Sequence, residues 1–435
     1  MAGYFNNTFP KIREEMLNSN FWIENLNIDL NEIASLSEIL EFNKKNIEYG
    51  YIRDIFNTKN YDKYYVDKII KSISKKHEEK RYVNGRQIEE DYFENLEGDL
   101  NLSNIKNISQ YGMCIRRTII KSYPTEDRIF KNCDDYSLDR FMESAINVCE
   151  PCTVLHESLD GKWMFIETYN CMGWVKKEYV ALGKKDEIED YCNSKDFIIV
   201  TGKRITTGYN PLEKRVSLIS IDMGVKMKLL RNKETIYDMD TTTGYVALFP
   251  IKSELDQSLE FKEIVIPRSE DVSVGFLPYN SQNIIKQAFK CLGERYGWGG
   301  EFFARDCSSF VLDVLKTMGV YIPRNTGEQE NRSFGEALSL ENREFEDKKK
   351  ILDSALPSSI LYMNGHVMIY LGKYENEYYI IHDTVGFYIS RICDKKEGDL
   401  KYIKANGVTI SPMSITYTTD GENYIRKIKT IKIFK

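Results

Sequence analysis

The sequence predicts a multidomain α+β protein: a mainly helical N-terminal region, then two small β-barrels, then a C-terminal α+β domain. Its length of 435 residues corresponds to roughly three domains of average size. Helical spacing of apolar residues near the N-terminus gives way to short β-type runs separated by turn residues. Helical spacing returns near residue 276 and strand-like runs follow it, which is typical of an α+β unit.

Composition and charge exclude several classes of protein. Hydrophobic residues make up 42% and charged residues 29%, and 60 basic against 66 acidic side chains give a net charge of −6. An acidic chain without an Arg-rich arm is a poor candidate for binding nucleic acid or an anionic membrane. No apolar run reaches the ~18 residues of a membrane span, so we expect no membrane insertion.

The first residues contain no apolar segment after a basic stretch, so the sequence predicts no secretory signal. We therefore expect a cytoplasmic protein. The alternative is the cell envelope or secretion, if a leader has been removed.

Residues 1–108 form the predicted helical region. Ile33, Leu36, Ile39 and Leu40 have the spacing of one apolar helix face. His77 lies within a run of charged residues, so we expect it on the surface.

Residues 109–184 and 185–272 are predicted to form the two β-barrels, and the family resemblance described below implies that both are SH3-like. Both segments contain short apolar runs at intervals of 8 to 12 residues, which suits a small barrel. The Asp160-Gly161 pair between two such runs indicates a hairpin. His156 alternates with apolar neighbours there, which favours a structural role.

The nine cysteines do not form a disulfide or metal pattern. Their number is odd and their spacing irregular. Cys149 and Cys152 form one CxxC, but no second CxxC or histidine pair completes a zinc site. We expect buried thiols there, with no metal and no cofactor.

The C-terminal domain is predicted over 273–435 and begins with two helices. Ser281 is the expected N-cap of the first helix, and Gly293 its end. The second helix begins at Cys307 and ends at Gly319. Strands follow, with a tight Asn-Gly turn directly before His366 and a second strand that carries His382.

Cys307, His366 and His382 are the candidate catalytic set. A helix N-terminus stabilises a thiolate, although the position of Cys307 alone leaves a nucleophile and a structural thiol equally open. Two strands joined by a short turn are antiparallel neighbours, so the two histidines can meet across the pair. A cysteine facing a histidine that is oriented by a second polar group is a nucleophilic arrangement of the papain type.

The strings YGWGG, DCSSFV, IPRN, GHVMIYLG and IIHD resemble the NlpC/P60 cysteine peptidases over about 276–435. The similarity is greatest to γ-D-glutamyl-L-diamino acid endopeptidases that contain bacterial SH3 domains and cut murein stem peptides. DGKWMFIETYNCMGWVKKEYVALG looks like such an SH3 domain, and RRTIIKSYPTEDR resembles the segment that opens this region. The N-terminal segment is similar to a stabilising domain of some members.

The resemblance implies a papain-like fold with Cys307 as nucleophile, His366 as base and His382 as the orienting residue. It places Tyr296 and Trp298 in the substrate groove, with the Tyr296 hydroxyl as a candidate oxyanion donor. An aromatic pair that packs the junction of helix and loop is the alternative for these two.

The resemblance also implies that Ser308 hydrogen-bonds the substrate peptide. From its position, Asp306 is expected to brace the start of the helix rather than to take part in the chemistry.

Asn325 departs from the family pattern. Members that require the free amine of an N-terminal L-Ala usually carry Asp after the Pro-Arg pair, whereas the amide of Asn325 offers an ammonium a hydrogen bond without an opposite charge. The SH3 domain of such enzymes adds a carboxylate and a tyrosine; Asp134, Asp135 and Tyr136 are candidates for these positions. The departure leaves open whether a free N-terminus is required.

The leading hypothesis is a monomeric cysteine endopeptidase that hydrolyses the bond between γ-D-Glu and the diamino acid (diaminopimelate or Lys) through an acyl-enzyme on Cys307. Its partner is a murein peptide or peptidoglycan. The alternatives are a non-catalytic peptidoglycan-binding protein and an acyltransferase of the same fold.

Overall fold

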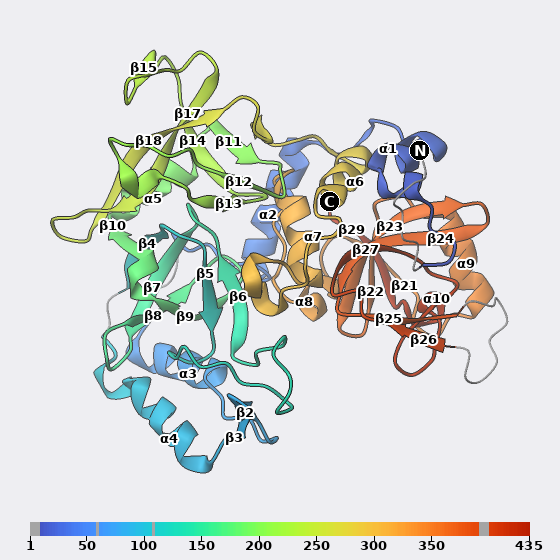
Figure 1. Ribbon diagram of the computed structural model, residues 1–435, viewed down its shortest axis with the longest axis horizontal. Coiled ribbons are helices and arrows are strands. Elements are labelled where there is room, and N and C mark those ends of the chain that lie inside the picture. The colour runs from blue at the N-terminus through green and yellow to red at the C-terminus, as the bar shows by residue number, and fades with distance from the viewer. Residues whose placement is uncertain (1–8, 58–60, 107–108, 391–399) are drawn as a thin grey trace. The chain divides into compact units, whose positions relative to one another are not determined.

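The computed structural model describes residues 9–57, 61–106, 109–390 and 400–435 (Figure 1). The chain divides into two compact units, of which the first comprises Met1–Tyr51, Leu277–Gly297 and Phe302–Lys435. The second comprises Ile52–Phe276 and Trp298–Glu301. Helices and strands occur in both units, and the predicted multidomain α+β class is confirmed. The predicted boundaries of the four domains stay a prediction.

The first unit is built on a six-stranded antiparallel sheet of order β21-β29-β22-β23-β24-β27. Its strands are β21 (Glu336–Ser339), β29 (Thr430–Ile433), β22 (Ile360–Met363), β23 (His366–Tyr374), β24 (Glu377–Thr384) and β27 (Gly407–Pro412). A small sheet contains β26 (Leu400–Ile403), β25 (Phe387–Ser390) and β28 (Thr416–Tyr417), and a short pair contains β1 (Glu32–Ala34) and β20 (Tyr279–Asn280).

Helices of the same unit surround this sheet. They are η1 (Glu14–Leu17), α1 (Ser19–Asn25), α2 (Leu36–Glu48), α6 (Ser281–Lys290), α7 (Cys307–Lys316), α8 (Thr326–Glu330), α9 (Phe345–Ser354) and α10 (Tyr424–Lys427). Helix α7 packs against β23 and β24, while Leu352 of α9 and Tyr424 of α10 share a hydrophobic cluster with Met368 and Ile380 of these strands. The sheet therefore holds α7 close to β23 and β24, the strands that carry His366 and His382.

Tight turns fix the register of β23 and β24, the strands that carry His366 and His382. Gly365, with φ of +69°, supplies the left-handed conformation of the turn between β22 and β23. Glu375 and Asn376 both have positive φ and join β23 to β24, which pair antiparallel. The predicted hairpin is confirmed.

One detail of the predicted helices differs. The N-cap of α6 is Asn280, whose side chain accepts a hydrogen bond from the Asn283 amide at 2.8 Å, so Ser281 is the first helical residue instead. Gly293 and Gly319 do follow α6 and α7 with the positive φ typical of helix ends.

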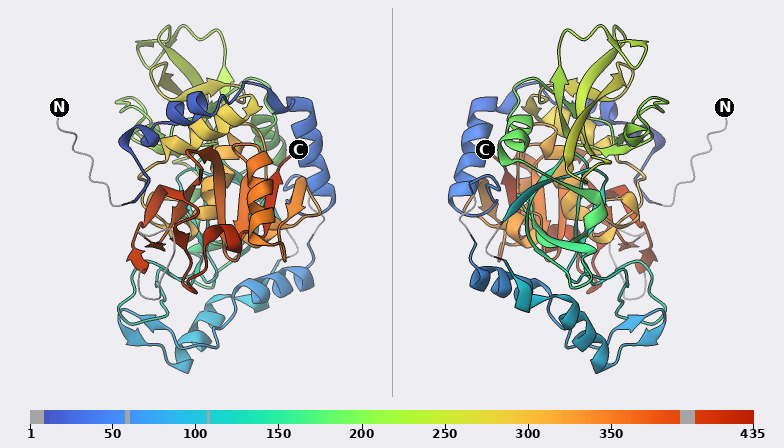
Figure 2. Two further views of the ribbon diagram at one scale, coloured as in Figure 1. Left: turned by 90° about the vertical axis from the view of Figure 1, so that its right-hand side faces the viewer. Right: turned by 90° about the vertical axis from the view of Figure 1, so that its left-hand side faces the viewer.

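Helix α2, blue in Figures 1 and 2, belongs to the first unit. The ring centroid of its Phe42 lies 6.2 Å from that of Phe434. Ser35 and Glu38 form a capping box at its start. The buried side of α2 contains Ile39 and Phe42, whereas Leu36 and Leu40 are exposed and Ile33 lies on β1. The predicted apolar face was therefore wrong in three of its four members.

The second unit contains a seven-stranded sheet of order β10-β4-β7-β8-β9-β5-β6. Its strands are β4 (Gln110–Cys114), β5 (Thr118–Lys121), β6 (Met142–Ile146), β7 (Pro151–Glu157), β8 (Trp163–Glu167), β9 (Met172–Lys176) and β10 (Val180–Gly183). Gly161, with φ of +66°, lies in the turn between β7 and β8, as the Asp-Gly pair predicted.

A five-stranded sheet of order β18-β17-β14-β11-β19 follows in the same unit. It consists of β11 (Phe197–Val200), β14 (Lys226–Leu230), β17 (Gly244–Lys252), β18 (Leu259–Pro267) and β19 (Val272–Val274). Two-stranded hairpins are β2 (Tyr82–Val83) with β3 (Arg86–Gln87), β12 (Arg204–Thr206) with β13 (Ser220–Asp222), and β15 (Thr235–Ile236) with β16 (Met239–Asp240). The helices are α3 (Lys63–Ile73), α4 (Glu90–Asp99), α5 (Lys185–Cys192), η2 (Leu102–Asn104), η3 (Lys177–Tyr179) and η4 (Lys214–Val216).

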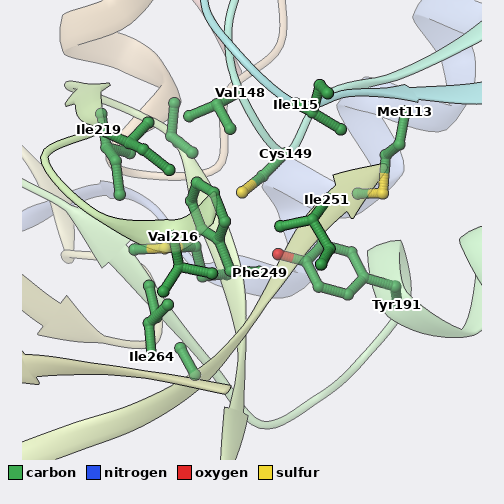
Figure 3. Packing of buried hydrophobic residues seen from close by; sticks show 14 of the residues in the cluster. Met113, Ile115, Val148, Cys149, Tyr191, Val216, Ile219, Phe249, Ile251 and Ile264 are labelled. Carbon is green, nitrogen blue, oxygen red and sulfur yellow. The ribbon is translucent and has the colours of Figure 1, made fainter. Parts of the chain in front are cut away.

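Side chains from both β-rich segments share one core, in which Val148 and Cys149 lie with Tyr191 and Phe249 (Figure 3). The Tyr191 hydroxyl donates to the backbone carbonyl of Leu248 at 3.0 Å, so its polar end is satisfied. Cys149 and Cys152 are buried free thiols.

The two histidines of this unit are structural. Nε2 of His156 lies 3.0 Å from the carbonyl oxygen of Leu100, in agreement with the predicted structural role. His77 is half-buried against the rings of Phe93 and Phe141, so its prediction as a surface residue was wrong. Among the helices of the described residues, none is long and apolar enough to cross a membrane.

Candidate active site

Asp306 fixes the start of helix α7. Its carboxylate accepts hydrogen bonds from the Ser309 amide at 2.9 Å and from Arg324 Nη1 and Nη2 at 3.1 and 2.7 Å. The Ser309 hydroxyl in turn accepts from the Asp306 amide at 2.9 Å, which completes a capping box. Burial alone would raise the pKa of Asp306, but Arg324 outweighs it and lowers this pKa to about 2. Asp306 therefore braces the helix as an ion, as expected.

Cys307 is the first residue of α7 and is 7% exposed. Its Sγ lies 3.8 Å from Oγ1 of Thr326, and the backbone amide of Val367 also hydrogen-bonds the sulfur. Burial, and after it the charge of Asp306, raises the pKa of the thiol to about 12, while the Thr326 and Val367 contacts lower it. The resting thiol is thus uncharged, with two donors placed to stabilise a thiolate.

His366 and His382 meet across β23 and β24. Nε2 of His366 lies 2.7 Å from Nδ1 of His382, and Nε2 of His382 lies 2.9 Å from Oγ of Ser411. Burial lowers the pKa of His366 to about 4 and that of His382 well below its ordinary value, the latter further reduced by His366. Both imidazoles are therefore neutral at physiological pH.

Cys307 and the histidine pair are connected through β23. Val367, which hydrogen-bonds the thiol, directly follows His366 in this strand. Within the described part of the chain, the Cys307 thiol has no direct hydrogen bond to His366. Such bonds are often long before substrate binds and tighten in the reacting complex.

Tyr296 lies near the Cys307 thiol. It is 7% exposed, and its amide donates to the Asn406 carbonyl at 3.0 Å. Burial raises the pKa of its hydroxyl, and the next contributions come from Cys307, Asp306 and Asp383. The phenol thus remains a neutral donor close to the nucleophile.

Asp383 was not singled out by the sequence reasoning. It follows His382 in β24 and is completely buried. Among the described residues, no side chain hydrogen-bonds its carboxylate. Burial, and then Asp306 and Glu294, raises its pKa well above the ordinary value. The signal in the sequence was an acidic residue directly after His382, at the end of the string EYYIIHD.

An ion-pair network lies beside the helix start. Arg305 donates to Glu294 at 2.7 Å and to Asp313 at 2.8 Å, and all three are buried. The sequence reasoning also missed this network, as well as Thr326 and Ser411, because nothing in the local sequence shows which residues meet.

Ser308 and Asn325, both predicted to contact the substrate, differ in their exposure to solvent. The Ser308 hydroxyl is buried and contacts Asp306 at 3.0 Å and Arg324 at 2.7 Å. Asn325 is the exposed N-cap residue of α8, and its amide donates to Glu328 at 3.3 Å. Their roles toward a substrate stay predictions.

Trp298 belongs to the second unit, where the Arg140 guanidinium lies 5.2 Å from its ring centroid. Asp134, Asp135 and Tyr136 belong to the second unit too, and the Asp135 carboxylate accepts from the Ser137 amide at 2.9 Å. Roles in substrate binding stay predictions for all of these. In the described ranges, no cluster of His, Cys, Asp and Glu is arranged to hold a metal ion.

Comparison with known proteins gives two family matches. Residues 293–426 match the NlpC/P60 family, and residues 128–176 match an SH3 domain of the SH3b1 type. No match was found among curated proteins. The two matches confirm the predicted NlpC/P60 domain near the C-terminus and the predicted SH3 domain upstream of it.

Two solved structures show similarity. An NlpC/P60 endopeptidase from Photobacterium damselae subsp. piscicida has a TM-score of 0.75 and 17% identity, with 96% of both chains covered. An NlpC/P60 family protein from Bacillus cereus ATCC 10987 has a TM-score of 0.46 and 17% identity, with 67% of this chain and 82% of that chain covered. The first of these shows a shared fold.

Proposed function

We propose that this chain, a cysteine hydrolase with an NlpC/P60 domain and an SH3 domain of the SH3b1 type, cleaves the amide bond between γ-D-glutamate and the diamino acid of murein peptides. The observation that carries the proposal is the placement of Cys307 at the start of α7, next to the strand that begins with His366. The similar Photobacterium structure is an endopeptidase of this family, which supports peptide hydrolysis.

The hydrogen bond between His366 and His382 supports a proton path for the proposed reaction. Nε2 of His366 is engaged by His382, which leaves Nδ1 to accept the proton of the Cys307 thiol. The sulfur attacks the amide carbonyl, and the carbonyl π electrons move onto oxygen. His366 then returns its proton to the leaving amine as the C–N bond breaks, and an acyl-enzyme remains on Cys307.

Deacylation follows the same path in reverse. Water gives a proton to Nδ1 of His366 and attacks the thioester carbonyl, and the Cys307 thiolate leaves and takes that proton back. The Tyr296 hydroxyl and the Cys307 backbone amide are the proposed donors to the oxyanion of both tetrahedral intermediates.

The neutral resting state suggests how the thiol is activated. Burial disfavours the charged forms of both Cys307 and His366, so the proton moves as the sulfur attacks. The Thr326 hydroxyl and the Val367 amide stabilise the developing negative charge on sulfur. In this scheme the two donors assist a thiolate that forms only transiently.

Asn325 bears on the proposed substrate. The oxygen of its side-chain amide accepts a hydrogen bond from an ammonium group but carries no opposite charge, so the interaction is weaker than an ion pair with a carboxylate. We therefore infer that an N-blocked peptide is cleaved at a rate within about tenfold of the free peptide, since a hydrogen bond with one charged partner and a neutral hydrogen bond differ by roughly 1 kcal/mol.

A substrate panel tests the proposal. The peptides are L-Ala-γ-D-Glu-diaminopimelate, its lysine analogue, an N-acetylated form and an α-linked glutamate isomer, with products identified by mass spectrometry. The wild type should release L-Ala-γ-D-Glu and spare the α-linked isomer. Cys307→Ala should be inactive, and Cys133→Ala, which removes an exposed thiol, should match the wild type.

The same panel separates the alternatives. Binding to intact peptidoglycan without release of any amine would support a non-catalytic binding protein. Formation of a new amide with an added amine acceptor, in place of hydrolysis, would support an acyltransferase. Equal activity of wild type and Cys307→Ala would contradict the proposed nucleophile.

A further inference from the structure

Ser411 extends the contact between the two histidines into the sheet. It lies in β27, the strand next to β24, and is completely buried, as is His382. Its Oγ lies 2.9 Å from Nε2 of His382, whose Nδ1 lies 2.7 Å from Nε2 of His366. The three side chains therefore form one continuous hydrogen-bonded chain.

The strand register holds Ser411 in this position. Ser411 is paired with Ile380, and His382 is paired with Thr409, two residues along the same antiparallel ladder. Residues two apart in a strand point to the same face, so Ser411 lies diagonally across from His382 on that face. Because both are buried, water does not replace the serine hydroxyl as a partner of His382.

Which atoms donate and which accept along this hydrogen-bonded series depends on the charge of His366. A neutral imidazole has one N–H, so with both rings neutral the chain can run in either direction. Once His366 takes a proton, both of its nitrogens carry hydrogen, and Nε2–H must donate to Nδ1 of His382. His382 then carries its proton on Nε2, which must donate to the Ser411 oxygen.

We propose that Ser411 is a positioning residue that acts through His382: its oxygen accepts from Nε2–H of His382, and this keeps the Nδ1 lone pair of His382 directed at His366. The inference rests on the proposed function, because it assigns His366 as the base. Ser411 stabilises the imidazolium that forms when His366 takes the Cys307 proton.

Loss of the hydroxyl has a defined consequence. In Ser411→Ala the Nε2–H of His382 would be buried without a partner, or His382 would move its proton to Nδ1. A proton on Nδ1 of His382 faces Nε2 of His366, which forces the His366 proton onto Nδ1 and removes the base. We expect a fall in kcat of about tenfold with KM unchanged, the effect of one unpaired buried donor.

The experiment compares wild type, Ser411→Ala, Ser411→Thr and Ser358→Ala. Threonine restores the hydroxyl and suits a strand. Ser358→Ala is the matched control, since Ser358 is a buried serine of the same unit whose hydroxyl contacts Ser281 at 2.9 Å. Its backbone amide donates to the carbonyl of Tyr370, four residues along β23 from His366. Activity on the γ-linked tripeptide gives kcat and KM, and ¹⁵N NMR of labelled histidines gives the tautomers of His382. Thermal unfolding confirms that each variant is folded.

The inference predicts that wild-type His382 carries its proton on Nε2, that Ser411→Ala loses kcat, and that Ser411→Thr and Ser358→Ala retain it. An Nδ1–H tautomer of His382 in the wild type would overturn the proposal. This NMR measurement uses the wild-type protein alone, so it does not depend on whether a variant folds. Unchanged kcat in folded Ser411→Ala, or equal loss in folded Ser411→Thr, would overturn it too. If the wild type shows no Cys307-dependent hydrolysis, the proposed function fails, while the tautomer still reports on the Ser411 bond.

Discussion

Arg324 binds Asp306 through two parallel hydrogen bonds, 3.1 Å from Nη1 and 2.7 Å from Nη2, in a buried site directly before Cys307. A bidentate pair of this kind fixes orientation as well as distance. Because Asp306 also caps α7, the pair determines where the helix starts and hence where the thiol lies.

Replacing Arg324 with methionine should destabilise the protein by about 3–5 kcal/mol, because it leaves the Asp306 charge buried without its main partner. Urea unfolding measures this change. The matched control is Arg332→Met, which breaks an exposed pair with Glu341 at 2.5 Å and should cost less than about 1 kcal/mol. Equal destabilisation of the two variants would show that the Asp306 pair has no special role.

His382 should be needed for turnover more than for folding. His382→Ala removes the partner of His366 and should lower kcat by about a hundredfold, within the range of positioned acid–base groups, whereas His382→Asn should retain part of it. The control is His156→Gln, a buried histidine of the second unit that binds a backbone carbonyl. Steady-state kinetics would contradict this role if His382→Ala matched the control.

Activity should persist at lower pH than for an enzyme with an exposed histidine base. His366 acts as a base only when neutral, and burial lowers its pKa to about 4, so protonation stops the reaction only near that pH. The acidic limb of the kcat/KM profile for the free enzyme should thus fall clearly below 6.5, the ordinary value. An acidic limb at or above pH 6.5 would contradict the buried neutral pair.

The buried carboxyl group of Asp383 should lower the free energy of unfolding at neutral pH. Its pKa is raised on folding, so the folded state binds the proton more tightly, and stability falls as pH rises above the unfolded value of about 3.9. Asp383→Asn should therefore be more stable than the wild type near pH 7, with a difference that shrinks toward pH 4.

The comparison for Asp383 is Asp313→Asn, which removes the partner of Arg305 and should destabilise instead. Denaturant unfolding across pH measures both variants. A destabilised Asp383→Asn at pH 7 would mean that the carboxylate is ionised and has a partner in solution.

Several features could be predicted from the sequence because they depend on neighbouring residues. The Asn-Gly turn before His366 and the short turn before Glu377 place β23 and β24 side by side, and the helix that begins at Cys307 follows from local apolar spacing. The family motifs led to the NlpC/P60 and SH3 classification for the same reason, since they are short and contiguous.

Other features depend on tertiary contacts that no local pattern shows. Thr326 reaches Cys307 from another helix, and Ser411 reaches His382 from a strand 29 residues later. Leu36 and Leu40 had helical spacing but lie exposed, because α2 is buried along Ile39 and Phe42. His77 illustrates the same limit, since its charged neighbours gave no sign of the Phe141 ring beside it.

The most direct test of the account is a search for the acyl-enzyme. The protein is mixed with L-Ala-γ-D-Glu-diaminopimelate, quenched in acid within one turnover, digested and mapped by mass spectrometry. We expect an L-Ala-γ-D-Glu thioester on Cys307 and release of free diaminopimelate in the wild type, and neither in Cys307→Ala. Hydrolysis that proceeds equally in Cys307→Ala, with no adduct on the wild-type cysteine, would contradict it.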